Sequence, residues 1–143
     1  MQPYVHKVRY YETDKMGITH HANYIHWMEE ARIEFLRQTG WGYDRMEACG
    51  IVSPVVRVEC EYKSPCTFDD EIEISMRIEQ YTRAKLTVAY EMRHCKTGKI
   101  VCTGRSEHCF LDQGGAFLRL HKAFPELHAL LAGLAEQNGN TAP

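Results

Sequence analysis

Hydrophobic and polar residues alternate along four segments between residues 55 and 111. In residues 71–80, Ile72, Ile74 and Ile78 point to one face, while Glu71 and Glu73 point to the other. A period of two with one hydrophobic face is typical of antiparallel strands that cover a core on one side. The pattern predicts strands at residues 55–63, 71–80, 85–95 and 100–111.

A different spacing, of three and four residues, runs through residues 23–39 and predicts an amphipathic helix. The residues on its hydrophobic face are Tyr24, Trp27, Met28, Ala31 and Phe35. Gly40 follows at the position where a helix often ends in a left-handed backbone conformation. This long hydrophobic helix is therefore the natural cover for the sheet.

Three further elements are predicted at the margins of this pattern. Residues 5–12 alternate and form a first strand, and residues 43–49 form a short helical turn. Pro125 suits the first turn of a last helix. The hydrophobic stripe of that helix is Leu127, Leu130, Leu131 and Leu134. Residues 1–137 then make one domain, and residues 138–143 a disordered tail.

The order of strand, helix and four strands predicts an α+β fold. In it a five-stranded antiparallel sheet wraps around one long helix, and a C-terminal helix is added. A length of 143 residues fits a single domain. Such a chain buries enough surface to need no disulfide or metal.

Composition and charge exclude several classes of protein. The net charge of −2 gives no basic field for nucleic acid. No hydrophobic run approaches the ~18 residues needed to span a membrane. The polar start of the chain resembles no secretion signal, so we expect a cytoplasmic protein. The six cysteines form no C-x-x-C pair, which favours reduced thiols over a zinc ribbon.

The residues with the clearest chemistry lie between the first strand and the long helix. Asp14, Gly17, His20 and His21 fall there within a few positions. Unpaired N–H groups at a helix start favour negative charge and can stabilise an oxyanion. A carboxylate facing them could act as a general base on water, or attack a carbonyl directly. A simpler interpretation, a loop carboxylate near a helix, also remains open.

Two other features have an ordinary structural interpretation beside a functional one. His20, His21 and His26 contain no pair at i and i+4, so no metal site is expected. Tyr24, Trp27 and Met28 could line a substrate pocket, but this spacing is more often that of a core. His21 could act through its ring or through its backbone.

The segment YETDKMGITHHANYIHWMEEAR closely resembles the signature of the 4-hydroxybenzoyl-CoA thioesterase family. It is most similar to the bacterial acyl-CoA thioesterase branch that includes the enzyme encoded with the Tol-Pal envelope system. The resemblance covers residues 5–111 and, more loosely, residues 118–131. It implies a hotdog fold, dimers often paired into homotetramers, and active sites at the subunit interface.

The resemblance also implies roles for individual residues. Asp14 matches the family's catalytic aspartate, Gly17 its loop glycine, and His21 the residue whose backbone N–H binds the thioester carbonyl. Asn23 and Tyr24 match its N-Y pair, and Arg83 matches a residue that contacts coenzyme A phosphates. The residues expected to bind substrate are thus Asn23, Tyr24, Trp27, Met28 and Arg83.

The function expected from the sequence is hydrolysis of an acyl-CoA thioester to a free acid and CoA, without a metal or other cofactor. Two rivals come from other classes. A hotdog dehydratase usually carries a histidine and a helical carboxylate, a layout that this chain lacks. Other hotdog lineages place a catalytic carboxylate on this helix, which leaves Glu29 as a minor candidate. A non-catalytic acyl-CoA-binding module would keep the fold without the chemistry.

Overall fold

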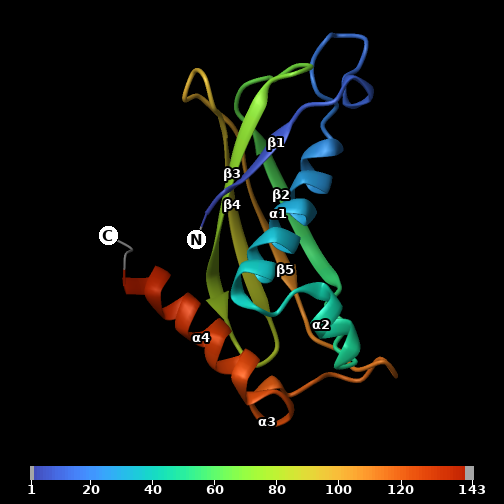
Figure 1. Cartoon of the computed structure of the whole chain (residues 1–143), viewed down its shortest axis with the longest axis vertical. Coiled ribbons are helices and arrows are strands. Elements are labelled where there is room, and N and C mark those ends of the chain that lie inside the picture. The colour runs from blue at the N-terminus through green and yellow to red at the C-terminus, as the bar shows by residue number, and fades with distance from the viewer. Residues whose placement is uncertain (1, 141–143) are drawn as a thin grey trace.

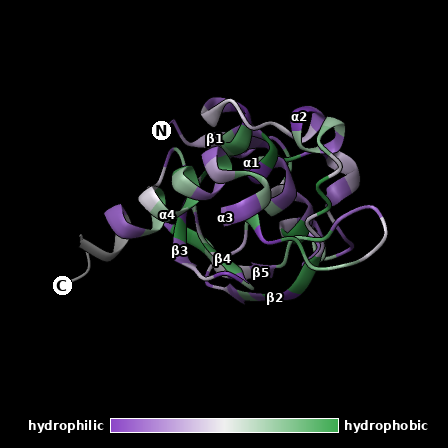
Figure 2. Cartoon of the chain, turned by 90° about the horizontal axis from the view of Figure 1, so that it is seen from below, coloured by the Kyte–Doolittle hydropathy of each residue, from purple (hydrophilic) through white to green (hydrophobic). Residues whose placement is uncertain are grey.

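The computed structural model describes residues 2–140, with side chains described through residue 137. Its five strands form one antiparallel sheet in the order β1-β3-β4-β5-β2, and the long helix α1 lies along one face of that sheet (Figure 1). The strands are β1 (Tyr4–Lys7), β2 (Val55–Tyr62), β3 (Glu71–Tyr81), β4 (Leu86–His94) and β5 (Ile100–His108). Figure 2 shows the strands as a curved layer on one side of α1. The predicted α+β architecture is confirmed.

Helix α1 (Asn23–Thr39) has the boundaries that its hydrophobic spacing predicts. All five residues of the predicted stripe are buried, and Trp27 and Met28 have no exposed surface. They pack against inward residues of the sheet such as Ile72 and Met92, which are equally buried. Complete burial of one such side chain contributes roughly 1.5–3 kcal/mol. The helix ends at Gly40, whose φ of 86° satisfies the left-handed turn.

The remaining helices are short, apart from the last. They are the 3₁₀ turn η1 (Tyr10–Glu12), α2 (Tyr43–Ala48), α3 (Leu120–Ala123) and α4 (Pro125–Asn140). Pro125 begins α4 as expected, and the helix lies against β3 with Leu127 and Leu131 buried. Residues 138–140 belong to its last turn, and residues 141–143 lie outside the described residues. The disordered tail therefore stays a prediction.

The predicted first strand, residues 5–12, is wrong in its second half. Strand β1 ends at Lys7, and the chain turns into η1 because the Glu12 carboxylate accepts a hydrogen bond from the Arg9 amide at 2.7 Å. His6 faces inward and is buried, whereas Val5 is 48% exposed. The last strand likewise ends at His108 instead of residue 111, and Leu111 only forms isolated bridges.

Strand β2 is an edge strand whose hydrophobic residues are not covered within the protomer. Val56 is 57% exposed, Val58 37% and Tyr62 48%. On one side β2 pairs with β5, and its other side carries unpaired backbone groups. A hydrophobic open edge of this length is a template for pairing with another chain.

Gly104 in β5 marks a point of very close packing. A Cβ atom there would lie 2.6 Å from the Glu59 carbonyl oxygen and against Met28 Cε. We expect Gly104→Ala to lower the free energy of unfolding by about 2 kcal/mol, because the backbone of β2 cannot yield as a side chain can. Urea denaturation measures this. The matched control is Gly133→Ala in α4, which meets no atom within 4 Å and should stabilise by about 0.5–1 kcal/mol. Equal stability of both variants would contradict the close packing.

Candidate active site

The loop between η1 and α1 is closed on itself by short hydrogen bonds. Thr13 and Thr19 form an isolated bridge, and the Asp14 amide donates to the Ile18 carbonyl at 2.9 Å. The Gly17 amide donates back to the Asp14 carbonyl at 2.9 Å, with Gly17 at φ +80°. That backbone conformation is why a glycine stands in the loop.

The side chain of Asp14 is partly exposed, and one of its two oxygens accepts a hydrogen bond. Its Oδ1 accepts a hydrogen bond from the Met16 amide at 2.8 Å, the Asx turn that aspartate favours in loops. Within the described part of the chain, its second oxygen has no hydrogen-bond partner. The carboxylate is therefore fixed in direction, with one oxygen available to a substrate or a water molecule.

The segment between β2 and β3 holds the loop from the other side. The Thr19 amide donates to the Cys66 carbonyl at 2.8 Å. The Thr67 hydroxyl donates to the Gly17 carbonyl at 2.6 Å. These bonds fasten both limbs of the loop to the sheet.

A surface pocket of about 330 Å³ opens between this loop, the start of α1 and the end of β2. Its lining residues are Asp14, Met16, Ile18, Thr19, His21, Tyr24, Tyr62, Lys63, Ser64 and Pro65. One carboxylate, one histidine and two phenols thus share a partly hydrophobic pocket. The structure brings together three of the predicted site residues here, namely Asp14, His21 and Tyr24.

His21 lies just before α1, and its carbonyl is already engaged by the Tyr62 hydroxyl at 2.9 Å. Its amide donates no hydrogen bond to any residue that the structure describes. This N–H stands at the positive end of α1, where charge on a carbonyl oxygen is stabilised. Burial raises the pKa of Tyr62 to about 12, with the nearby Cys60 as a further cause. Tyr62 is therefore a neutral hydrogen-bond donor at neutral pH.

Two residues expected to bind an acyl group lie in the core instead. Trp27 and Met28 are fully buried and do not line the pocket. Trp27 donates from Nε1 to Glu12 at 2.7 Å, and Met28 packs where β5 carries Gly104. The core interpretation of the helix stripe is the correct one for both.

Asn23 also differs from the expectation. Its side-chain amide donates to the Glu12 carbonyl at 2.9 Å and to the His20 carbonyl at 3.3 Å. It does not line the pocket. Asn23 therefore ties the loop of residues 13–19 to the helix start.

Arg83 lies far from Asp14 within the protomer. It follows β3, whereas the segment that lines the pocket precedes β3, and the two ends of an 11-residue strand are about 33 Å apart. The two loops lie at opposite ends of the sheet in Figure 1. Arg83 lines a separate basic hollow with Arg119, His121 and Lys122.

Sequence reasoning missed the wall formed by Tyr62, Lys63, Ser64 and Pro65. Tyr62 and Lys63 belong to the strand predicted at residues 55–63, and Ser64 and Pro65 lie between it and the next predicted strand. No local pattern marks them, because they join the site through the pairing of β2 with β5. A large aromatic residue at the exposed end of a strand is the one available signal.

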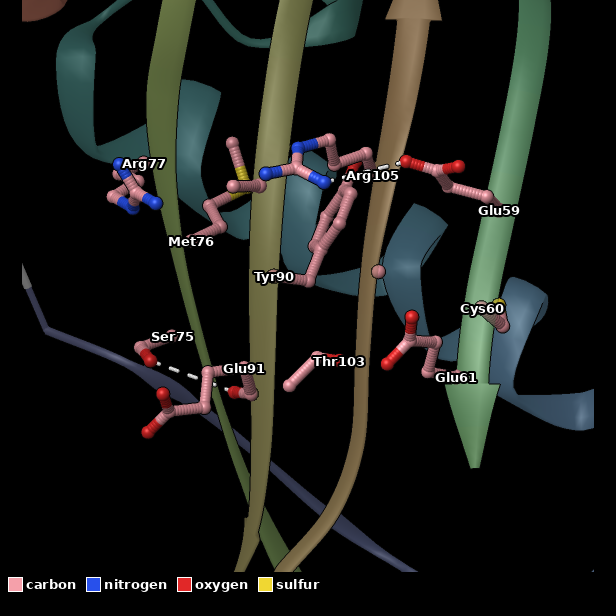
Figure 3. A pocket seen from close by; sticks show the side chains of 12 residues that line it. Glu59, Cys60, Glu61, Ser75, Met76, Arg77, Tyr90, Glu91, Thr103 and Arg105 are labelled. Carbon is pink, nitrogen blue, oxygen red and sulfur yellow. Dashed lines mark hydrogen bonds and ion pairs between the residues drawn. The ribbon is translucent and has the colours of Figure 1, made fainter. Parts of the chain in front are cut away.

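A larger hollow, of about 530 Å³, lies on the outer face of the sheet, away from α1 (Figure 3). Its charged residues form ion pairs, several of them with residues just outside the hollow. Arg105 contacts Glu79 at 2.7 Å and Glu59 at 3.4 Å, and Arg93 contacts Glu91 at 2.7 Å beside it. A face of mutually neutralised charges offers no activated group, so the pocket at Asp14 is the better candidate.

Among the described residues, no group of three or more His, Cys, Asp or Glu side chains is placed to hold a metal ion. None of the helices in residues 2–140 has both the length and the hydrophobicity to cross a bilayer.

Residues 8–132 match the sequence profile of the thioesterase-like superfamily. The chain belongs to this superfamily. It is 35% identical over 123 residues to YneP of Bacillus subtilis, provisionally named an acyl-CoA thioesterase, with 85% of this chain and 88% of YneP covered. It is 37% identical over 111 residues to a protein of Aquifex aeolicus provisionally named an esterase, with 78% and 85% covered.

Among solved structures, the superfamily fold is reproduced closely by a DHNA-CoA thioesterase from Staphylococcus aureus. The TM-score is 0.92 at 29% identity, covering 99% of this chain and 95% of that one. The hotdog fold expected from the motif is thereby confirmed. The family resemblance is confirmed at the level of the thioesterase-like superfamily.

Proposed function

We propose that this superfamily member hydrolyses acyl-CoA thioesters to a free acid and CoA, with Asp14 as the catalytic carboxylate. The observation that carries the proposal is the shared pocket of Asp14 and His21. Both residues line it, and one Asp14 carboxylate oxygen and the His21 backbone N–H have no hydrogen-bond partner among the described residues. The names of the relatives support thioester hydrolysis as the reaction class.

In the proposed reaction the thioester carbonyl oxygen accepts a hydrogen bond from the His21 amide at the start of α1. The helix dipole and this N–H stabilise the oxyanion that forms. Asp14 either removes a proton from the attacking water or attacks the carbonyl itself to give a mixed anhydride that water then cleaves. The C–S bond breaks when the tetrahedral adduct collapses, which in the second route is before water cleaves the anhydride. The leaving thiolate takes up a proton to give the CoA thiol. The reaction requires no metal or redox cofactor.

We further propose that the site is completed by a second copy of the chain. Antiparallel pairing of two β2 edges would place the end of one β2 beside the start of the other. The partner subunit's Arg83 would then lie at the same end of the assembly as Asp14. There it could contact CoA phosphates together with the Arg119 and Lys122 that line the same hollow.

The finer placements made from the motif remain part of this proposal. They are membership of the Tol-Pal-associated branch, pairing of dimers into a homotetramer, and a cytoplasmic location. The branch and the pairing of dimers are supported by the resemblance of residues 11–32.

The test is a thiol-release assay with aromatic, short-chain, medium-chain and long-chain acyl-CoAs. We expect turnover with at least one class, with stoichiometric free acid and CoA. Formation of an enoyl thioester from a 3-hydroxyacyl-CoA without thiol release would favour the dehydratase. Tight acyl-CoA binding without release of thiol from any class would favour the binding module, and either result would reject the proposal.

A further inference from the structure

Glu12 lies two residues before Asp14 and is buried, although it is a carboxylate. It is only 5% exposed, and both of its oxygens are engaged. Oε1 accepts hydrogen bonds from the Arg9 amide at 2.7 Å and from His6 Nε2 at 2.8 Å. Oε2 accepts one from Trp27 Nε1 at 2.7 Å. Burial of a charged carboxylate costs free energy unless hydrogen bonds compensate for it. The complete set of donors around Glu12 therefore indicates a specific role.

The backbone of Glu12 joins the two ends of the loop that carries Asp14, residues 13–19. Its carbonyl accepts hydrogen bonds from the His20 amide at 2.8 Å and from the Asn23 side chain at 2.9 Å. The hydrogen bond between Glu12 and His20 encloses the loop of residues 13–19, and Asp14 lies near the start of that loop. Strand β1, the turn η1, the returning limb of the loop and helix α1 therefore all meet at one residue.

The charge state of Glu12 fits this position. Burial acts to raise its pKa, but the donors from Arg9, His6 and Trp27 outweigh burial and hold the pKa below the ordinary value. At neutral pH the side chain is a pure acceptor facing three donors. His6 also contacts Glu30 through Nδ1 at 3.1 Å, so its ring bridges two carboxylates.

We propose that Glu12 is a positioning residue, which holds the Asp14 carboxylate in register with the helix start. Glu12 does not line the pocket and so touches no substrate. It acts by fixing the path of the backbone from β1 to Asp14 relative to α1. The inference rests on the proposed role of Asp14, since it concerns the geometry of that same site.

The test is Glu12→Gln in the full chain. The amide keeps the size of the side chain but replaces an acceptor with an NH₂ donor, which must face Trp27 Nε1–H or the donors at Arg9 and His6. We expect kcat for the best acyl-CoA to fall about 10- to 100-fold, while KM changes less than about threefold because no substrate contact is lost. A merely structural role would lower the fraction of folded protein and leave the kcat of that fraction unchanged.

The matched control is Glu30→Gln. It makes the same change on the other carboxylate that contacts His6, in a residue that forms no contact with the loop. Its kcat should stay within about twofold of wild type, because the Glu30 side chain is 42% exposed and its contacts are with His6 and Tyr4 instead of the loop. Folded fractions are measured by circular dichroism and urea denaturation at the assay temperature.

A second variant covers the case in which Glu12→Gln does not fold. Asn23→Ala removes one donor to the Glu12 carbonyl at a helix end, and we expect a loss of kcat of about three- to tenfold with little change in KM. The inference would be overturned if kcat of folded Glu12→Gln were unchanged. If Glu12→Gln does not fold, an unchanged kcat of folded Asn23→Ala would overturn it. So would a loss seen only in KM. If wild type is inactive, or Asp14→Asn is fully active, the proposed function itself fails instead.

Discussion

Replacing Asp14 with asparagine should lower kcat for acyl-CoA hydrolysis by about 10³-fold, within the range expected when a general base is lost. Asparagine keeps the size of the side chain, and its amide oxygen can still accept the Met16 amide. The loop conformation is therefore preserved. The second oxygen becomes an NH₂ group, which can neither accept a proton nor attack a carbonyl. Thiol release at saturating substrate measures the loss.

The matched control for this prediction is Asp69→Asn. Asp69 is an exposed loop aspartate with φ of 73°, a conformation that asparagine adopts readily. Its only ion pair, among the described residues, joins it to Lys7 at 3.3 Å. The variant should turn over within about twofold of wild type, since an exposed pair contributes little. Asp14→Asn with near wild-type kcat would remove Asp14 from the mechanism, whatever the control shows.

The elements of the fold could be predicted where local chemistry decides the structure. The spacing of Tyr24, Trp27 and Phe35 gives α1 its buried face, and Gly40 ends the helix through its positive φ. Alternation gives β3 and β4 because one face of each is covered. The first strand was predicted too long because a buried side-chain contact, Glu12 with the Arg9 amide, turns the chain. Such a contact leaves no periodic signal.

The candidate site likewise contains residues that the sequence predicts and residues that only the tertiary structure brings together. Asp14, Gly17 and His21 lie within eight positions of each other, so one motif predicts them together. Tyr62 joins them only through the packing of the β2 end beside α1, 41 residues away from His21. The spacing of Trp27 predicts that it is buried, but not that its indole Nε1 donates to Glu12. A partner for Nε1 follows only from the tertiary structure.

The open edge β2 leads to the second large prediction. Replacing Val56 and Val58 together with lysine should convert the proposed dimer to a monomer and lower kcat/KM by about 100-fold or more. Both side chains are more than a third exposed in the protomer, so the change costs the isolated chain little. Across a twofold interface, each buried unpaired charge costs roughly 2 kcal/mol or more, and symmetry doubles the number. Light scattering with size-exclusion chromatography measures the mass.

The matched control is Val5→Lys on β1, the edge strand at the opposite side of the sheet. Val5 is 48% exposed, similar to the β2 valines, and faces outward. This variant should remain dimeric and active. A β2 double variant that stays dimeric would show that the interface lies elsewhere. A monomeric variant with full kcat/KM would show that Asp14, His21 and the α1 start form a complete site within one protomer, without the partner subunit's Arg83.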